Sequence, residues 1–334
     1  MRNRSAKHYL GLLFITACLL SQPGLAEERW YQVELLVFSH ESGASAEEWK
    51  ALPQLTYPPA ARFLVYPARV AARRDAHSGN SRIDEFGRQI ITRGDSAEDI
   101  PLRPSSQLAA GAADGSGETG MTEPAQSLPA LPTPYIALPH QQRELHGKSS
   151  YMQRTGRFRT LFHETWVQPV QPEPDALPLV LDESGAMQDW PRLQGSVKLY
   201  LSRYLHVETN LWLNTPGDYL PGEWRMPAPP WGPSSLVVEM PEPPLEREPY
   251  FVSPAAAPSE PGTNLDPNDV GLAETGPVSP WRHAVLMQQS RRMRSNEIHY
   301  IDHPLLGVVV KLTPLDGQQL AAMAAAEAAA DEAP

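Results

Sequence analysis

The sequence predicts an α+β fold: an antiparallel β-sheet core with few short helices and long proline-rich loops. First, apolar and polar residues alternate with a period of two in four segments, residues 30–38, 158–167, 196–213 and 282–312. Second, 41% of the 334 residues are hydrophobic, which is enough to form a core. Third, the chain has 36 prolines, about twice the average share, and they are clustered.

The first 26 residues have the composition of a signal peptide. Arg2, Arg4 and Lys7 precede an apolar run over residues 9–20, and small residues then lead to an expected cleavage site after Ala26. The run is shorter than the ~20 residues that a membrane-spanning helix needs. Without this segment the formal net charge changes from −11 to −14, because three basic residues and no acidic ones are lost. We therefore expect a periplasmic protein with no membrane span.

A lipoprotein signal is the alternative for this segment. Residues 15–18 read Ile-Thr-Ala-Cys, which would make Cys18 a lipidated N-terminus. The apolar run, however, continues through Leu19 and Leu20, where a lipoprotein usually becomes polar. This favours ordinary cleavage.

Residues 27–100 are expected to form an N-terminal β/α part of the core. The strand over 30–38 has apolar residues on both faces near its end, which predicts a central position in the sheet. Ser45 and Glu48 have the spacing of a helix start, and Pro53 would end that helix. Residues 62–66 have the composition of a second strand.

Residues 101–134 are rich in Pro, Gly, Ser and Ala and show no periodicity, which predicts a disordered insertion. Residues 135–316 are expected to form the main antiparallel β part of the core. It begins with a helix over 139–154 and a strand over 158–167 that Pro169 would stop.

The clearest pattern in the chain covers residues 196–213. Its odd positions are apolar except for Arg203 and Thr209, and its even positions are largely polar. This predicts one long bent strand, or two strands that meet near Arg203 and Tyr204. Further on we expect a short strand over 235–240, a surface loop over 241–280 and two or three antiparallel strands over 281–312. Residues 317–334 are read as an Ala-rich flexible tail.

Catalytic motifs are not evident in the sequence. Cys18 is the only cysteine, so the mature chain would have no Cys nucleophile, disulfide or Cys-based zinc site. We find no phosphate-binding loop, dinucleotide fingerprint or nucleophile elbow. The net negative charge of the chain also argues against nucleic-acid binding. We therefore predict no enzyme activity and no cofactor.

One segment has the residue types of a metal site. His299 and His303 would share a face of a helix and could then bind zinc. On a strand they would lie about 13 Å apart, four residues at about 3.3 Å each, which is too far for one metal ion. The neighbouring residues favour a strand, so we expect His299, Asp302 and His303 to satisfy backbone groups or to pair with arginines.

Residues 290–294 read Ser-Arg-Arg-Met-Arg, an unusual density of basic residues in an acidic chain. They could protect a sheet edge, pair internally with Glu208, Glu297 or Asp302, or bind an anionic glycan or an acidic partner. Alternation places Arg292 and Arg294 on one face and Arg291 on the other. We expect Arg291 and Arg203 to be internal and paired with Asp302 or Glu208.

Aromatic residues are also concentrated in one region. Trp212, Tyr219, Trp224 and Trp231 lie within 20 residues on Pro- and Gly-rich sequence. Exposed rings would stack on sugars or fill a pocket of a partner, whereas covered rings would close one end of the sheet. Including these aromatic residues, the candidate binding residues are Arg291, Arg292, Arg294, Arg203, His206, His299, Asp302, His303, Trp212, Trp224 and Trp231.

Four pieces of the sequence resemble the CsiV family of gammaproteobacterial periplasmic proteins. They are Arg-Trp-Tyr-Gln-Val-Glu-Leu-Leu-Val-Phe at 29–38, Leu-Phe-His-Glu-Thr-Trp-Val-Gln-Pro at 161–169, residues 193–195 leading into Arg-Tyr-Leu-His at 203–206, and Ser-Arg-Arg-Met-Arg-Ser at 290–295 with His-Tyr-Ile-Asp-His-Pro at 299–304 and Gly307. Their order covers most of the chain outside the insertion.

The resemblance implies a non-catalytic periplasmic protein that binds peptidoglycan and supports cell-wall synthesis and cell shape. It also implies cooperation with the outer-membrane lipoprotein that activates a class A penicillin-binding protein. The alternatives are an envelope assembly factor and a cryptic metal-dependent wall hydrolase.

Overall fold

The computed structural model describes residues 29–41, 50–93, 131–217, 226–239 and 283–331. The expected signal peptide, the helix start at Ser45, most of the insertion, the loop over 241–280 and Trp224 lie outside these residues. Among the described residues, no helix is both long enough and apolar enough to cross a membrane.

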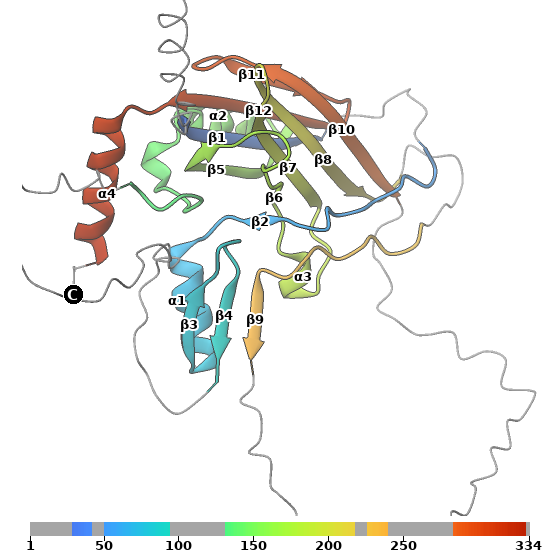
Figure 1. The fold of residues 1–334 in the computed structure, drawn as a ribbon. Coiled ribbons are helices and arrows are strands. Elements are labelled where there is room, and N and C mark those ends of the chain that lie inside the picture. Colours follow the sequence, from blue (N-terminus) through green and yellow to red (C-terminus); the bar gives the residue numbers. More distant parts are fainter. Residues whose placement is uncertain (1–28, 42–49, 94–130, 218–225, 240–282, 332–334) are drawn as a thin grey trace, which may run out of the picture.

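Two sheets form the body of the fold (Figure 1). In sheet A the order is β11-β12-β1-β5, and all pairs are antiparallel. In sheet B the order is β10-β8-β7-β6-β2, and β2–β6 is its parallel pair. The strands of sheet A are β1 (Arg29–His40), β5 (Phe158–Val170), β11 (Ile298–Asp302) and β12 (Leu306–Pro314); those of sheet B are β2 (Arg62–Phe63), β6 (Leu179–Val180), β7 (Leu193–Leu201), β8 (Leu205–Thr215) and β10 (His283–Met293).

A small third sheet and short helices complete the described part of the chain. The third sheet, of order β3-β4-β9, is packed beside helix α1 (Figure 1). These elements are β3 (Asn80–Ile83), β4 (Gln89–Thr92), β9 (Leu236–Glu239), α1 (Pro67–His77), the 3₁₀ turn η2 (His140–Gln142), α2 (His146–Arg154), α3 (Ser184–Met187) and α4 (Gly317–Asp331). The α+β class is confirmed.

The core lies between the inner faces of sheets A and B. Inward residues of β1 and β12, such as Leu35 and Val310, belong to the same buried cluster as inward residues of β7, β8 and β10, such as Val207 and Met287. Burying side chains of this size contributes about 1.5–3 kcal/mol each. The predicted strands therefore form a two-layer sandwich instead of a single sheet.

Helices cover the outer face of sheet A over its central strand β1. Leu36 and Phe38 of β1 pack against Leu145, just before α2, and Trp30 packs against Leu320 of α4. Both faces of β1 are thus buried, as expected for the central strand. Residues 317–331 of the expected flexible tail form helix α4, with Leu320 and Ala324 buried.

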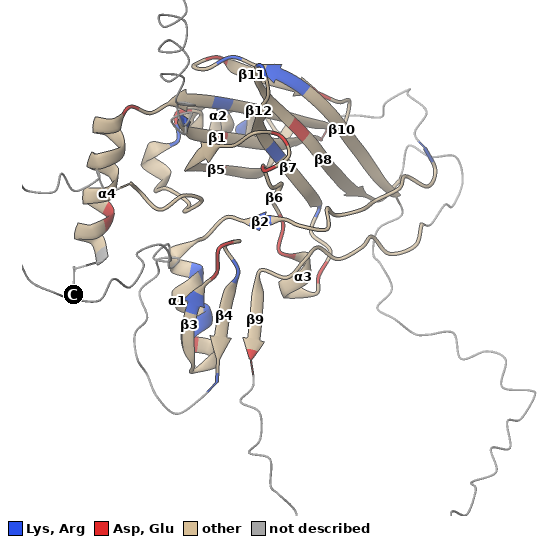
Figure 2. Cartoon of the chain, viewed as in Figure 1, with Lys and Arg blue, Asp and Glu red and all other residues tan. Residues whose placement is uncertain are grey.

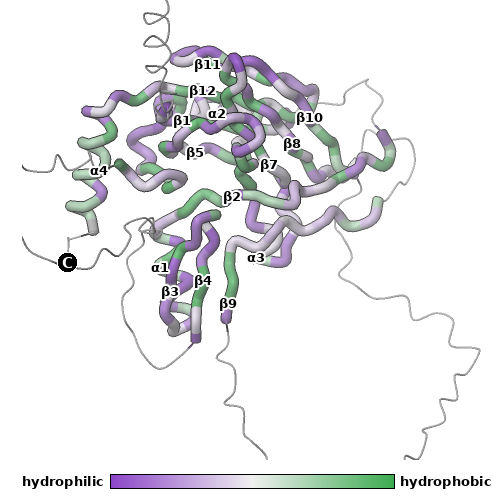
Figure 3. The backbone as a smooth tube through the Cα atoms, in the orientation of Figure 1, coloured by the Kyte–Doolittle hydropathy of each residue, from purple (hydrophilic) through white to green (hydrophobic). Residues whose placement is uncertain are grey.

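Of three expectations about where strands end, one changes. Strand β5 continues through Pro169 to Val170, because β5 is an edge strand and can lose one backbone donor on its open side. Residues 196–213 form two strands, which is the second of the two predicted alternatives, with Ser202, Arg203 and Tyr204 in the turn between β7 and β8. Residues 283–314 form three strands, but β10 pairs with β8 in sheet B while β11 and β12 lie in sheet A. Figure 3 shows hydrophilic chain at β11 and the adjoining part of β10, where the two sheets come together.

Candidate functional site

The outer face of sheet B presents polar side chains from three neighbouring strands. Ser196 of β7, Asn210 of β8 and Gln288 of β10 lie opposite one another in the register. The next row along the strands contains Lys198, Glu208 and Ser290. Figure 2 shows charged residues along β7 and β8 and basic residues at the end of β10.

A cavity of about 580 Å³ lies over these two rows, and we call it the sheet B groove. The six polar side chains form its floor, and residues 56–59 with Pro178 form its wall. Asn210 Nδ2 donates a hydrogen bond to the Thr56 carbonyl (2.8 Å), and Gln288 Nε2 donates to Asn210 Oδ1 (2.9 Å). The wall is therefore attached directly to the floor.

Tyr57 anchors the wall. Its hydroxyl donates to Asp182 (2.8 Å) and accepts from Gln194 Nε2 (3.1 Å), while its ring lies edge-on to Trp212, with centroids 4.9 Å apart. Burial, and next the charge of Asp182, raise the pKa of Tyr57 well above its usual value. Tyr57 therefore remains a hydrogen-bond donor at any physiological pH.

Asp182 fixes the backbone next to Tyr57 by accepting several hydrogen bonds. Besides Tyr57, the carboxylate accepts the Ser184 backbone N–H (3.0 Å), the Ser184 hydroxyl and the Gly195 N–H (2.9 Å). Gly195 has φ +115°, and a Cβ there would lie 2.1 Å from the Asn210 carbonyl oxygen. Only glycine allows this approach of β7 to β8 beneath Asp182.

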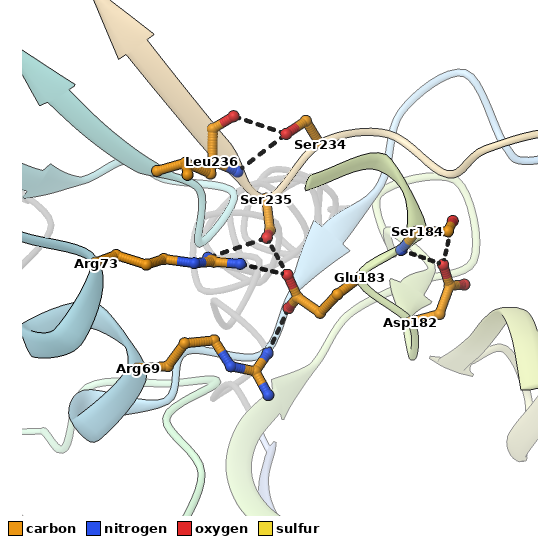
Figure 4. A network of polar contacts seen from close by, with 8 residues as sticks. All are labelled: Arg69, Arg73, Asp182, Glu183, Ser184, Ser234, Ser235 and Leu236. Atoms are coloured by element: carbon orange, nitrogen blue, oxygen red, sulfur yellow. Dashed lines mark hydrogen bonds and ion pairs between the residues drawn. The ribbon is translucent and has the colours of Figure 1, made fainter. Parts of the chain in front are cut away.

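An adjacent ionic network ties α1 to the sandwich (Figure 4). Glu183 forms ion pairs with Arg69 (2.6 Å) and Arg73 (2.7 Å) of α1 and accepts the Ser235 hydroxyl just before β9. Arg69 and Glu183 also line a second cavity, of about 360 Å³, where Arg143 and Glu164 form another ion pair. Each of these arginines and acids already has an ion-pair partner, so we take the sheet B groove, whose charges have none among the described residues, as the candidate site.

A basic and aromatic cluster adjoins the groove at the turn between β7 and β8. The Arg292 guanidinium lies 3.4 Å from the centroid of the Tyr204 ring, and that of Arg203 lies 5.6 Å from it. His206, opposite Arg292, stacks on Tyr200 at 5.1 Å. We call Arg203, Tyr204, His206 and Arg292 the basic rim. The structure thus brings together three of the candidate binding residues.

The expectation that Arg203 and Arg291 are internal is wrong. Arg203 lies exposed in the turn, so it does not occupy the inward row that the alternation suggested. Arg291 lies in the row of β10 residues that faces the core, but β10 is an edge strand, so the side chain reaches solvent. There it donates hydrogen bonds to Gln289 Oε1. Arg294 is exposed beyond β10 and pairs with Glu297 at 3.5 Å.

The remaining polar candidates stabilise local structure. His299 Nε2 accepts the Arg294 backbone N–H (2.9 Å), and His303 Nδ1 accepts the Leu305 N–H (3.3 Å). Asp302 accepts the Tyr300 hydroxyl rather than pairing with an arginine. Burial lowers the pKa of His303, although the charge of Asp302 opposes this. The described residues contain no group of three or more His, Cys, Asp or Glu side chains that could hold a metal ion.

The tryptophans mainly close the covered end of sheet B. Trp212 is 0% exposed, beneath Tyr57, and its Nε1–H donates to Gln194. Trp231 is 42% exposed and lies against Trp190, with ring centroids 5.8 Å apart. Trp212 is therefore not available to a ligand, whereas Trp231 is.

A buried ionic cluster lies on the opposite side of the molecule, under α2. Glu34 of β1 is 3% exposed; its carboxylate lies 2.8 Å from His163 Nε2 and accepts the backbone N–H groups of Glu144 and Leu145. His163 Nδ1 lies 3.3 Å from the Ser149 hydroxyl, which donates to the His146 carbonyl. Ser, His and Glu are in contact as in a hydrolase triad, but all three side chains are buried and already hydrogen-bonded to other protein groups. They hold the start of α2 on sheet A.

The groove residues were not singled out from the sequence. Ser196, Lys198, Glu208 and Asn210 belong to the polar row of the 196–213 pattern, which is the signal that could have identified them. That row alone predicts a solvent-facing sheet surface. The cavity exists because residues 56–59, far away in the sequence, lie across it.

Arg292 of the basic rim and the nearby exposed Arg294 allow a direct test of this basic surface. The family resemblance implies peptidoglycan binding, so replacing Arg292 and Arg294 by Ser should weaken binding to purified sacculi at low salt. The difference from wild type should shrink as salt screens the charges. The free energy of unfolding should change by no more than about 1 kcal/mol, since both side chains are exposed. The matched control is Lys148→Ser with Arg154→Ser on α2. Equal binding by both double variants at low salt would show that the arginines only protect a sheet edge.

The chain was compared with known families and proteins. It matches the family described as "Peptidoglycan-binding protein, CsiV" over residues 9–315, nearly its whole length. No curated protein and no solved structure matches it. By this match, the chain belongs to the CsiV family of peptidoglycan-binding proteins.

Proposed function

We propose that this protein binds peptidoglycan in the periplasm through the sheet B groove and acts there as a non-catalytic adaptor. Its expected partners are the outer-membrane lipoprotein activator of a class A penicillin-binding protein and, through it, the synthase. Such a protein would support wall synthesis and cell shape.

The groove is the observation that carries the proposal. Helices cover the outer face of sheet A over β1 and β5, but the outer face of sheet B has an open cavity with a floor of amide, hydroxyl and charged side chains. Amides and hydroxyls both donate and accept hydrogen bonds, as the hydroxyl and acetamido groups of a glycan require. The basic rim beside it adds a site for carboxylates of the stem peptides.

The family membership and the export-like N-terminal sequence support the periplasmic location. The adaptor role rests on the family resemblance. A protein that binds both the wall and a synthase activator would bring the activator to its substrate without chemistry of its own.

A pull-down from periplasm, with and without lysozyme digestion of the wall, tests both parts of the proposal. We expect the tagged protein to be recovered in the periplasmic fraction and to capture wall fragments before digestion. The lipoprotein activator should remain bound after digestion, because an adaptor contacts it directly. If no wall material is captured, the peptidoglycan-binding part fails; if the activator is lost on digestion, the adaptor part fails.

A further inference from the structure

The floor of the sheet B groove contains two opposite charges that do not pair. Lys198 and Glu208 lie directly opposite each other on β7 and β8, where opposite charges normally stabilise a sheet by pairing. In the part of the chain that the structure describes, neither has an ion-pair partner. The Lys198 ammonium instead lies 5.3 Å from the centroid of the Tyr200 ring.

No other described residue that lines this cavity is charged. The groove therefore presents one positive and one negative group, surrounded by amides and hydroxyls. A neutral glycan would leave both charges without a partner, and a simple anion would satisfy only Lys198. A ligand that carries a carboxylate and an ammonium close together would satisfy both.

Peptidoglycan differs from other glycans in bearing short stem peptides with free carboxylates and, where a diamino acid is not cross-linked, a free amine. We propose that Lys198 and Glu208 form a subsite for this zwitterionic diamino-acid centre. Lys198 binds its carboxylate and Glu208 binds its ammonium. This inference rests on the proposed function and names the part of the polymer that the groove recognises.

The volume of the groove and the other polar residues on its floor fit such a ligand. A volume of about 580 Å³ lies within the ~300–1,000 Å³ range of sites for small ligands. Asn210 and Gln288 lie next to the charged row and can pair with peptide or acetamido groups. The subsite would thus accommodate one amino-acid residue together with its neighbouring amide.

The test compares three soluble ligands by calorimetry: a disaccharide peptide with a free diamino-acid amine, the same compound acetylated on that amine, and a neutral chitooligosaccharide. Each is titrated into the full-length protein and into the variants K198Q, E208Q and K148Q. Lys148 is exposed on α2, away from the groove, and serves as the matched control.

Wild type and K148Q should bind the free-amine ligand about tenfold more tightly than the acetylated one, and should bind the chitooligosaccharide most weakly. E208Q should bind the free-amine and acetylated ligands equally, because it has lost the group that distinguishes them. K198Q should bind both more weakly while keeping the preference. Unfolding curves should agree for all four proteins, because Lys148 and Glu208 are exposed and the half-buried Lys198 has no ion-pair partner among the described residues to lose.

Two outcomes would overturn the subsite: a wild-type protein that does not distinguish the free amine, or an E208Q variant that still does. Sedimentation of wild-type protein with intact sacculi separates this failure from failure of the proposed function. Binding to sacculi without discrimination rejects the subsite alone, whereas no binding to sacculi rejects the proposed function as well.

Discussion

Replacing Glu34 by Ala is expected to lower the free energy of unfolding by about 3–5 kcal/mol. The buried carboxylate accepts two backbone N–H groups before α2 and contacts His163. Its removal leaves these buried donors without an acceptor, and each such loss costs about 1–3 kcal/mol. Urea denaturation followed by fluorescence of the buried tryptophans measures the change.

Glu144→Ala is the matched control for this prediction. The Glu144 carboxylate is exposed and pairs with Lys311, so its loss should change stability by no more than about 1 kcal/mol. Glu34→Gln keeps the shape and one acceptor and should fall between the two. Equal stability of the Glu34→Ala and Glu144→Ala variants would show that the buried cluster does not hold α2.

Replacing Asp182 by Ala is expected to lower the free energy of unfolding by about 3 kcal/mol or more and also to weaken sacculus binding. The carboxylate accepts hydrogen bonds from Tyr57, Ser184 and Gly195, and the variant would leave these donors buried without an acceptor. Tyr57 anchors the groove wall, so the wall should become mobile. Thermal unfolding and co-sedimentation, performed well below the melting temperature, measure the two effects.

Two variants separate the effects of Asp182. Asp189→Ala removes an exposed carboxylate on the same loop, whose contact is the Trp190 N–H, and should change neither stability nor binding appreciably. Tyr57→Phe removes the hydrogen bonds of the hydroxyl to Asp182 and Gln194 but keeps the ring on Trp212, and should weaken binding with a smaller loss of stability. If Asp182→Ala unfolds at the same temperature as Asp189→Ala, the anchor has no structural role.

The strands could be predicted from the sequence because alternation is a local property. Strand β1 and the C-terminal strands, two or three in number, were predicted from their apolar period. Their division between two sheets could not be predicted, since β10 pairs with β8 far away in the sequence and not with β11. Arg203 is a second example. Apolar residues occupy odd positions both before and after the three-residue turn, so alternation alone does not show that Arg203 lies in the turn and not in a strand.

Helix α1 was missed for a physical reason. Val70 is its one buried residue, so it has no apolar stripe, and it is held to the sandwich through the pairing of Arg69 and Arg73 with Glu183. Glu183 lies more than 100 positions further on, and no local pattern connects these charges. The groove depends on similar long-range contacts, because its floor is in the 196–213 pattern while its wall comes from residues 56–59.

The central claim is that peptidoglycan binds in the sheet B groove, and a substitution that fills the groove tests it most directly. Ser290 is exposed on the floor of the groove, so the indole of Ser290→Trp should occupy the cavity without disturbing the core. Ile298→Trp, at an exposed position on β11 of sheet A, is the matched control. In co-sedimentation with purified sacculi, Ser290→Trp should bind at least about tenfold more weakly than wild type, a difference of about 1.4 kcal/mol, and Ile298→Trp should bind normally. Wild-type binding by a folded Ser290→Trp variant would contradict the claim.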